Sequence, residues 1–304
     1  MAQRSSGHDH VAVIGAGAIG GFFAAKLHEA GHEVTLCVRT PIERLVLEQA
    51  GERRAAPVRI VTDPAGERPV AWVFVATKAQ DTAGAEPWLG ALSDSGTTVV
   101  VLQNGIDQAE RAKPFAPTSS IVPAVVYCGA ERVAPGYIVH HQSSRLIVPE
   151  GEAGARLGEL FSSTGVEVVR TPDFLTASWR KLLGNVAANP ITALTMRRIG
   201  VLREPDVNAL AQKLLAEAVA VGTAAGAKLT PEDAESVLEA QRRLDEGAGT
   251  SMLYDRLAGQ PLEHEYITGA VVRTADRHGV DAPVNRAILA LLRALSAGLK
   301  PTKS

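Results

Sequence analysis

Val11-Ala-Val-Ile-Gly15-Ala-Gly17-Ala-Ile-Gly20 is the stretch that decides the fold, because it indicates a buried strand turning through glycines into a helix. Gly15 permits the tight turn, Gly17 lets a phosphate approach the backbone, and Gly20 lets the helix pack closely on the strand. The helix N-terminus then offers free N–H donors and its positive dipole end to an anion. The stretch predicts a site for a dinucleotide pyrophosphate, made by Gly15, Gly17, Ala18, Ile19 and Gly20.

The surroundings of these glycines favour the dinucleotide interpretation over a plain glycine-rich turn. With 28 glycines in the chain, a chance match to the pattern is expected. Here, however, an apolar strand precedes the glycines and residues 19–30 have helical periodicity. Gly31 then ends the helix, and residues 33–38 indicate a second strand.

Composition limits the class of protein. The chain has 304 residues, enough for two domains, with 46% hydrophobic residues, 21% charged residues and a formal net charge of -2. It lacks a basic field that would attract nucleic acid, and only 4% of its residues are aromatic. The apolar run 11–25 is interrupted by glycines and has no adjoining basic segment, so it belongs to the fold. We expect neither nucleic acid nor membrane as a partner.

Cysteines and histidines point to no metal or disulfide chemistry. Cys37 and Cys128 fall in apolar strand-like runs, so we expect buried free thiols and a reducing compartment, the cytoplasm. The eight histidines are scattered, and the pair His140-His141 has no further ligands at a metal-binding spacing. We therefore expect no metal site.

The periodicity of the chain changes near Thr171-Pro172. Before it, apolar runs indicate further strands that extend one sheet, at 58–61, 72–76, 97–102, 121–128, 137–141, 145–148 and 166–169. After it, helical periodicity dominates, at 175–196, 206–226, 231–244, 252–258, 263–278 and 283–299. The fold class expected is α/β, with a Rossmann-type doubly wound N-terminal domain, 1–172, and an all-helical C-terminal domain, 173–304. Apolar helices such as the one predicted from residue 206 leave room for a homodimer interface.

Polar residues follow the predicted parallel strands, where open α/β sheets bind their ligand. They are Arg39, Thr77-Lys78 and Gln103-Asn104-Gly105, and each alone could be an ordinary loop residue. Enzymes that bind NAD carry an acidic residue where this chain has Arg39. A guanidinium can instead grip a 2′-phosphate through bidentate hydrogen bonds, so Arg39 favours NADPH/NADP+, unless it is simply solvated.

A second polar constellation lies far along the chain. Lys181, Asn185 and Asn189 recur every four residues and form a stripe about 80° wide on a helix. Asparagine is a poor helix former, and a buried, unpaired amide costs about 1–3 kcal/mol. Either solvent or a ligand must therefore satisfy the stripe. Pro190 removes a helical hydrogen bond, so the helix is expected to kink or restart there.

Together these motifs resemble the ketopantoate reductase family over nearly the whole chain. They are the glycine stretch, Lys78, the Gln103-Asn104-Gly105 turn, the Lys181 helix and the segment 250–263, Thr-Ser-Met-Leu-Tyr-Asp-Arg-Leu-Ala-Gly-Gln-Pro-Leu-Glu. The resemblance implies that NADPH reduces a 2-oxo acid to a 2-hydroxy acid. The substrate implied is ketopantoate, reduced to pantoate for pantothenate and coenzyme A biosynthesis.

The resemblance also implies roles for individual residues. Lys181 would be the general acid that protonates the ketone oxygen, a step suited to an ammonium because hydride addition builds alkoxide character. Asn104 would lie between nicotinamide and substrate. Asn185 and Asn189 would orient substrate oxygens, and Lys78 would lie near the cofactor.

Two further roles have structural alternatives. Ser251 would bind the substrate carboxylate, and its alternative is a helix N-cap. Glu263 would contact the substrate and support Lys181, and its alternative is an acidic residue in the first turn of a helix.

Three positions depart from the family pattern and bear on the substrate. Gln260 and Leu262 replace an Arg and a Thr that precede the site Glu in familiar members, and Ile199 falls where they carry an Asn. A divergent reductase of another 2-oxo acid or ketone is therefore an alternative. So is a noncatalytic NADP(H)-sensing protein, which would have no need of the Lys181 set. An FAD enzyme is disfavoured by Arg39.

Overall fold

The computed structural model describes residues 9–299. Internal contacts divide the chain into two compact units. The first comprises residues up to Gln103 together with Asp107–Phe174, and the second comprises Asn104–Ile106 together with the chain from Leu175 onward. Residues 104–106 thus group with the helical unit, whereas the sequence predicts them within an N-terminal domain of residues 1–172.

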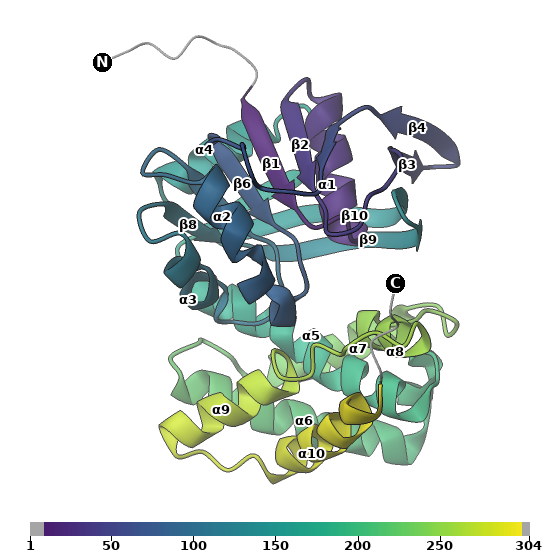
Figure 1. Ribbon diagram of the computed structural model, residues 1–304. Coiled ribbons are helices and arrows are strands. Elements are labelled where there is room, and N and C mark those ends of the chain that lie inside the picture. The colour runs from purple at the N-terminus through teal and green to yellow at the C-terminus, as the bar shows by residue number, and fades with distance from the viewer. Residues whose placement is uncertain (1–8, 300–304) are drawn as a thin grey trace. The chain divides into compact units, whose positions relative to one another are not determined.

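A six-stranded parallel sheet forms the centre of the first unit (Figure 1). Its strands are β1 (His10–Ile14), β2 (Glu33–Cys37), β5 (Arg59–Val61), β6 (Trp72–Val75), β7 (Thr98–Val101) and β8 (Ser120–Pro123). They lie in the order β5-β2-β1-β6-β7-β8, so the chain winds outward from β1 in one direction and from β6 in the other. This is the doubly wound arrangement expected from the sequence, and its ligand crevice is expected between β1 and β6.

A second sheet of five strands also belongs to this unit, and it corrects the prediction of one extended sheet. Its strands are β3 (Leu45–Gln49), β4 (Glu52–Ala56), β9 (Val125–Ala134), β10 (Tyr137–Pro149) and β11 (Glu167–Thr171). The run 121–128 is divided between the sheets after Pro123, which has no N–H to continue a strand ladder. The short strands β3 and β4 were not predicted. Only three residues of β3 are apolar, and four of the five residues of β4 are exposed, so neither has a long alternating pattern.

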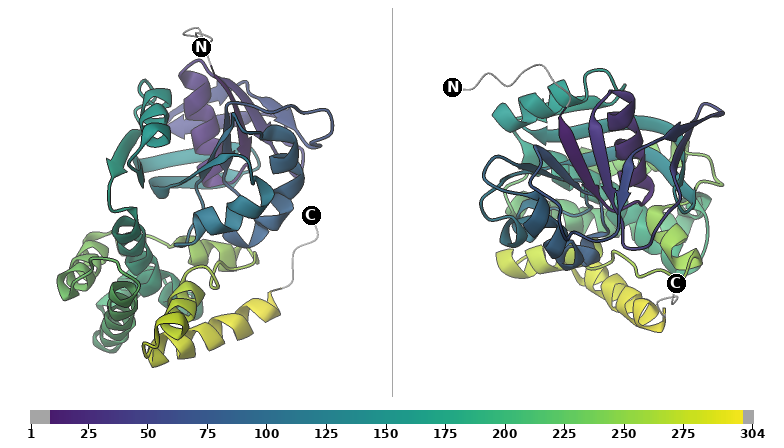
Figure 2. Two further views of the ribbon diagram at one scale, coloured as in Figure 1. Left: turned by 90° about the vertical axis from the view of Figure 1, so that its left-hand side faces the viewer. Right: turned by 45° about the horizontal axis from the view of Figure 1, so that its top comes forward.

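Helices cover both faces of the parallel sheet, which explains its continuously apolar strands. Val11 and Val13 of β1 join one core and Ala12 and Ile14 join the other. The helices are α1 (Ala18–Glu29), α2 (Glu86–Leu92), α3 (Gln108–Ala112) and α4 (Glu152–Leu160), with short 3₁₀ turns η1 (Ala79–Asp81), η2 (Ala83–Ala85) and η3 (Lys113–Phe115). Helix α1 packs against strands of both sheets (Figures 1 and 2). The glycine turn thus lies at the start of a helix that packs against both sheets.

The second unit is all-helical, as predicted. Its elements are α5 (Phe174–Thr195), η4 (Ile199–Arg203), α6 (Pro205–Ala224), α7 (Pro231–Arg243), α8 (Ser251–Leu257), α9 (Thr268–His278) and α10 (Pro283–Gly298). The larger apolar residues of α6, such as Leu214, Leu215 and Val221, are buried in the core of this unit and are not available to a dimer interface. A homodimer remains a prediction without this support.

The predicted start of α9 at residue 263 is wrong. Residues 264–267 form a turn instead, in which the N–H groups of Tyr266 and Ile267 both donate to the Glu263 carbonyl, at 3.0 and 3.1 Å. Glu263 therefore does not lie in the first turn of a helix, which removes that alternative for its role. The apolar pattern of 263–278 suggested a continuous helix. Leu262 and Ile267, which flank the turn, are both core residues, so the turn has the apolar spacing of a helix.

The two cysteines differ in environment. Cys37 is a buried free thiol, and burial raises its pKa to about 12, so it stays protonated. Cys128 is not in a disulfide bond and is only half-buried, which corrects the expectation that both thiols are buried. Within residues 9–299, no helix is both long and apolar enough to cross a membrane.

Candidate functional site

The glycine turn has the geometry that its sequence predicted. Gly15 has a φ of +106°, a value that residues with a side chain rarely adopt, and its N–H donates to the Cys37 carbonyl at 2.9 Å. A Cβ on Gly20 would lie 1.9 Å from the Gly15 carbonyl oxygen, so only glycine allows the helix to approach this closely. Helix α1 has Gly17 as its N-cap, no side-chain cap and no acidic residue in its first turn. These features fit a pyrophosphate bound at the helix N-terminus.

Gln103 joins the side chains at the ends of β6 and β7, a role that its place in the Gln103-Asn104-Gly105 turn did not predict. Gln103 is buried, and its Nε2 donates to Thr77 Oγ1 at 2.9 Å and to the Lys78 carbonyl at 3.2 Å. Its Oε1 accepts from Thr82 Oγ1 at 3.0 Å. Gln103 thereby fixes the Thr77-Lys78 turn. Arg39, another predicted cofactor-binding residue, lies two residues beyond β2 and is exposed.

Helix α5 carries Lys181, Asn185 and Asn189, as the four-residue spacing predicted. The helix does not restart at Pro190 but continues to Thr195, which corrects that part of the prediction. Core contacts on both sides of the proline, by Val186 and Ile191 among others, hold the helix together despite the missing N–H. The polar stripe is therefore displayed along one uninterrupted helix.

Three predicted site residues meet within the helical unit. Asn104 Nδ2 donates to Glu263 Oε2 at 2.9 Å, and Asn185 Nδ2 lies 3.5 Å from Asn104 Oδ1. Glu263 is 3% exposed, whereas Asn104, Asn185 and Lys181 are half-buried. Lys181 precedes Asn185 by one helical turn, so their side chains lie on the same face of α5. Asn104 contacts Asn185, and Glu263 contacts Asn104, so a carboxylate and a second amide lie beside this face.

Asn189 is the most deeply buried member of the polar stripe. Its side chain is 4% exposed, and Nδ2 has no hydrogen-bond partner among the described residues. Bulk solvent does not reach a group buried this deeply, and leaving it unpaired costs about 1–3 kcal/mol. An enclosed water or a ligand is therefore the partner left for this donor.

Helix α8 is fastened to the C-terminal end of α5. Thr250 Oγ1 lies 2.7 Å from Thr192 Oγ1, and Arg256 Nη1 donates to the carbonyls of Ala193 and Leu194, to the latter at 3.0 Å. Thr250 is the N-cap of α8, since its Oγ1 accepts from Leu253 N at 3.2 Å. The N-cap interpretation of Ser251 is therefore wrong by one residue, and the exposed Ser251 is the first residue within the helix.

Replacing Thr250 with valine is expected to lower the free energy of unfolding by about 1–2 kcal/mol, because the cap and its bond to Thr192 are both lost. Chemical denaturation followed by circular dichroism measures the change. Thr250→Ser keeps the capping hydroxyl and serves as the matched control. A valine variant as stable as wild type would contradict the assigned cap.

The three positions that depart from the family pattern have different environments. Ile199 and Leu262 are 5% and 3% exposed and belong to the apolar core of the helical unit. Both side chains are therefore largely shielded from solvent. Gln260 is exposed, and its Nε2 lies 3.4 Å from the Ala258 carbonyl. Leu262 anchors the segment that ends at Glu263.

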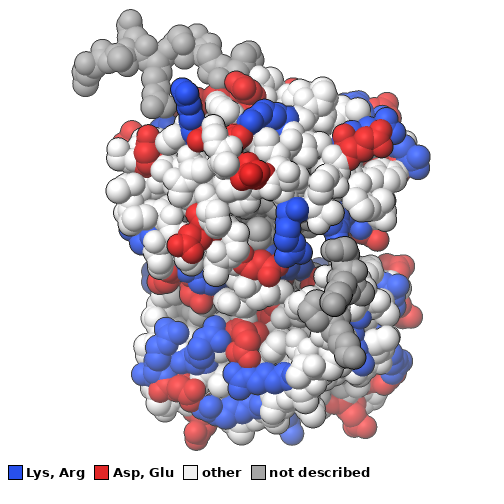
Figure 3. Space-filling model, in the orientation of Figure 1, with Lys and Arg blue, Asp and Glu red and all other residues white. Residues whose placement is uncertain are grey.

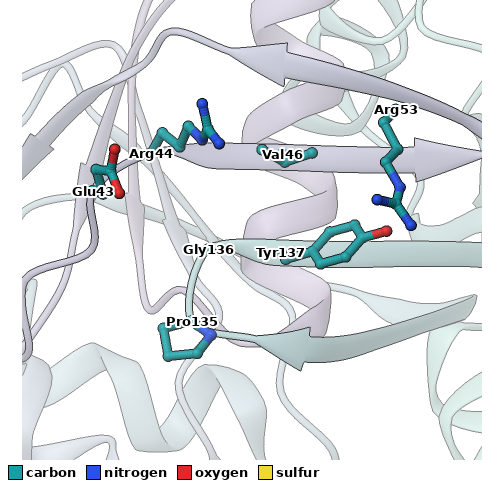
Figure 4. Close-up of a pocket in the computed structure, with 7 residues that line it drawn as sticks. All are labelled: Glu43, Arg44, Val46, Arg53, Pro135, Gly136 and Tyr137. Carbon is teal, nitrogen blue, oxygen red and sulfur yellow. The ribbon is translucent and has the colours of Figure 1, made fainter.

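A pocket of about 260 Å³ lies elsewhere in the first unit (Figure 4). It is lined by Glu43, Arg44, Val46, Arg53, Pro135, Gly136 and Tyr137. Glu48 accepts hydrogen bonds from both Arg53 and Tyr137, so the charge of Arg53 is paired with a carboxylate. None of the predicted site residues lines this pocket. No cluster of three or more His, Cys, Asp or Glu suited to a metal occurs in the part of the chain that the structure describes.

Comparisons with known proteins cover both units. The family model "Ketopantoate reductase PanE/ApbA" matches residues 11–153, and "Ketopantoate reductase PanE/ApbA C terminal" matches residues 173–296. A 2-dehydropantoate 2-reductase from Mycobacterium tuberculosis is 39% identical over 292 residues, which cover 95% of this chain and 98% of the relative.

Two solved structures extend the likeness to the fold. A dimeric ketopantoate reductase from Staphylococcus aureus has a TM-score of 0.88 at 24% identity, covering 96% of this chain and 100% of that one. A D-mandelate dehydrogenase in a ternary structure with NADH and anilino(oxo)acetate also has a TM-score of 0.88, at 23% identity, with 95% and 99% covered. At such identities the likeness concerns the fold alone.

Proposed function

Because the chain belongs to the ketopantoate reductase family of oxidoreductases, we propose that it reduces ketopantoate to pantoate with NADPH, a step toward pantothenate and coenzyme A. The observation that supports this most strongly is the hydrogen bond from Asn104 to Glu263 beside Asn185, one helical turn from Lys181. A sensor that only bound the nucleotide would not need this set of polar groups. The cytoplasm is the compartment proposed.

The proposed chemistry assigns each polar group a task. A bound nicotinamide supplies the hydride. Lys181 Nζ donates a proton to the ketone oxygen and stabilises the negative charge that develops there. Asn104 contacts the reacting centre, and Glu263 orients Asn104 through the 2.9 Å hydrogen bond and supports Lys181. Substrate oxygens are held by Asn185, Asn189 and Ser251.

The preference for NADPH is proposed from Arg39, because an exposed guanidinium after β2 suits a 2′-phosphate. Arg39→Ala is expected to raise the Kd for NADPH about 10- to 100-fold, since charge-assisted hydrogen bonds contribute about 1.5–3 kcal/mol. Fluorescence titration measures this Kd.

NADH is the internal control for this variant, because it has no 2′-phosphate for Arg39 to bind. Its Kd is expected to stay within about twofold, and Arg39→Lys should retain part of the NADPH affinity. An equal loss of affinity for both nucleotides would contradict the role of Arg39.

A panel of 2-oxo acids with NADPH and NADH compared side by side tests the proposed function. Loss of reduced-cofactor absorbance with ketopantoate is the expected result. Turnover of another 2-oxo acid instead would indicate a divergent reductase, to which the substitutions at Gln260, Leu262 and Ile199 already point. Tight NADPH binding without turnover of any substrate would indicate a sensing protein. A homodimer, proposed from the family, is tested separately by sedimentation.

A further inference from the structure

Backbone hydrogen bonds close the turn that follows Glu263. Tyr266 N and Ile267 N donate to the Glu263 carbonyl, and Gly269 N donates to the His264 carbonyl at 2.8 Å. Glu263 itself is 3% exposed. Because the carbonyl of Glu263 is part of the turn, any movement of the turn also moves the carboxylate that Asn104 contacts.

Glu265, within this turn, is held by arginines from two different helices. Arg293 of α10 donates to both carboxylate oxygens, with Nε at 2.6 Å and Nη2 at 3.0 Å. Arg273 of α9 donates to the Glu265 backbone carbonyl at 2.8 Å, and the same Nη1 lies 3.5 Å from its carboxylate. Both the side chain and the main chain of Glu265 are therefore hydrogen-bonded to side chains of α9 and α10.

The charges favour this arrangement. The Arg293 guanidinium holds the pKa of Glu265 below its usual range, so the carboxylate is ionised at neutral pH. Basic and acidic side chains intermingle over α9 and α10 on the face shown in Figure 3. An isolated pair with Arg293 58% exposed would contribute little, but a bidentate pair joined to a second arginine has a defined geometry.

We propose that Glu265 is a positioning residue, which with Arg293 and Arg273 fixes the turn that carries Glu263 in its buried, Asn104-bonded position. This rests on the proposed function of Glu263. Glu265 lies two residues beyond Glu263, and its carboxylate oxygens are taken up by Arg293 and Arg273, so it acts through the turn and not by touching substrate. Its effect is on the orientation of Glu263.

An ion pair that joins α10 directly to α9 allows the proposal to be separated from a simple tie between these two helices. Arg286 of α10 pairs with Asp276 of α9, and both side chains are about as exposed as Arg293. This pair does not touch the turn. Arg286→Ala therefore removes a comparable interhelical contact while leaving Glu265 held.

The test compares Arg293→Ala, Arg293→Lys and Arg286→Ala in the full chain, by steady-state kinetics and by hydrogen exchange of peptides spanning 262–270. Arg293→Ala is expected to lower kcat about tenfold, because small misplacements of a catalytic group have large effects, with the Kd for NADPH unchanged. It should also speed exchange in the turn. Arg293→Lys should recover part of kcat, and Arg286→Ala should match wild type in both readouts.

The proposal is overturned if the two alanine variants have equal kcat and equal exchange, or if Arg293→Ala leaves both at wild-type values. Failure of the proposed function has a different signature, namely a wild-type enzyme that turns over no 2-oxo acid. In that case the hydrogen-exchange result decides. Faster exchange of the turn in Arg293→Ala, but not in Arg286→Ala, supports the anchoring by Glu265, and unchanged exchange in Arg293→Ala overturns it.

Discussion

Replacing Lys181 with alanine is expected to lower kcat for ketopantoate reduction by about 10²- to 10⁴-fold, the usual contribution of a positioned general acid. The side chain is half-buried on the stripe of α5 that also carries Asn185, so a proton and a positive charge would be lost together at the reacting oxygen. NADPH binding should persist, because the proposed nucleotide contacts lie on the glycine turn and Arg39. Stopped-flow kinetics and fluorescence titration measure the two effects.

Arg180→Ala is the matched control for this variant. Arg180 is the neighbouring cation on α5, but it points to Asp233 of α7, with which it forms a 2.7 Å ion pair, and it is 54% exposed. We expect kcat within about twofold of wild type, since surface pairs contribute little. Full activity in Lys181→Ala would refute the proposed proton donor.

Gly17→Ala is expected to raise the Kd for NADPH at least about 30-fold, which corresponds to about 2 kcal/mol, without destabilising the protein. Gly17 has a φ of -72° and a ψ of -175°, a conformation that alanine adopts freely. A Cβ there would meet no protein atom within 4 Å. The added methyl group therefore collides only with a bound pyrophosphate. Isothermal titration measures the affinity, and the Tm of the cofactor-free protein should remain within about 1 °C.

Gly20→Ala is the contrasting variant on the same turn. Its Cβ would lie 1.9 Å from the Gly15 carbonyl, so the helix must move and the cofactor-free protein should lose stability. If Gly17→Ala bound NADPH with wild-type affinity, the pyrophosphate would not lie at this helix N-terminus. If it instead lost stability as Gly20→Ala should, the space beside Gly17 would not be reserved for a ligand.

Local patterns predicted the elements whose residues interact with near neighbours in sequence. The glycine turn followed from a positive φ at Gly15 and a close approach at Gly20, both of which are properties of single positions. The stripe on α5 followed from the four-residue spacing of Lys181 and Asn185. Such features survive in any tertiary context that keeps the strand or helix intact.

Longer-range features could not be predicted in this way. The division of the strands into two sheets depends on which distant segments pair, and β3 pairs with β10, some 90 residues away, through backbone groups that carry no sequence signal. The turn after Glu263 looked like a helix, because Leu262 and Ile267 are buried for reasons of tertiary packing. The bridging role of Gln103 was hidden in an ordinary strand-end turn.

The sequence by itself determined that a strand, a glycine turn and a helix offer a phosphate site, and that an ammonium and two amides share one helical face. Both depend on backbone conformation over a few residues, which local sequence encodes. Only the tertiary structure brought Asn104 to within 2.9 Å of Glu263, across 159 positions, and buried Asn189 without a partner. Those facts arise from packing of the whole helical unit, where burial decides which polar groups solvent can no longer satisfy.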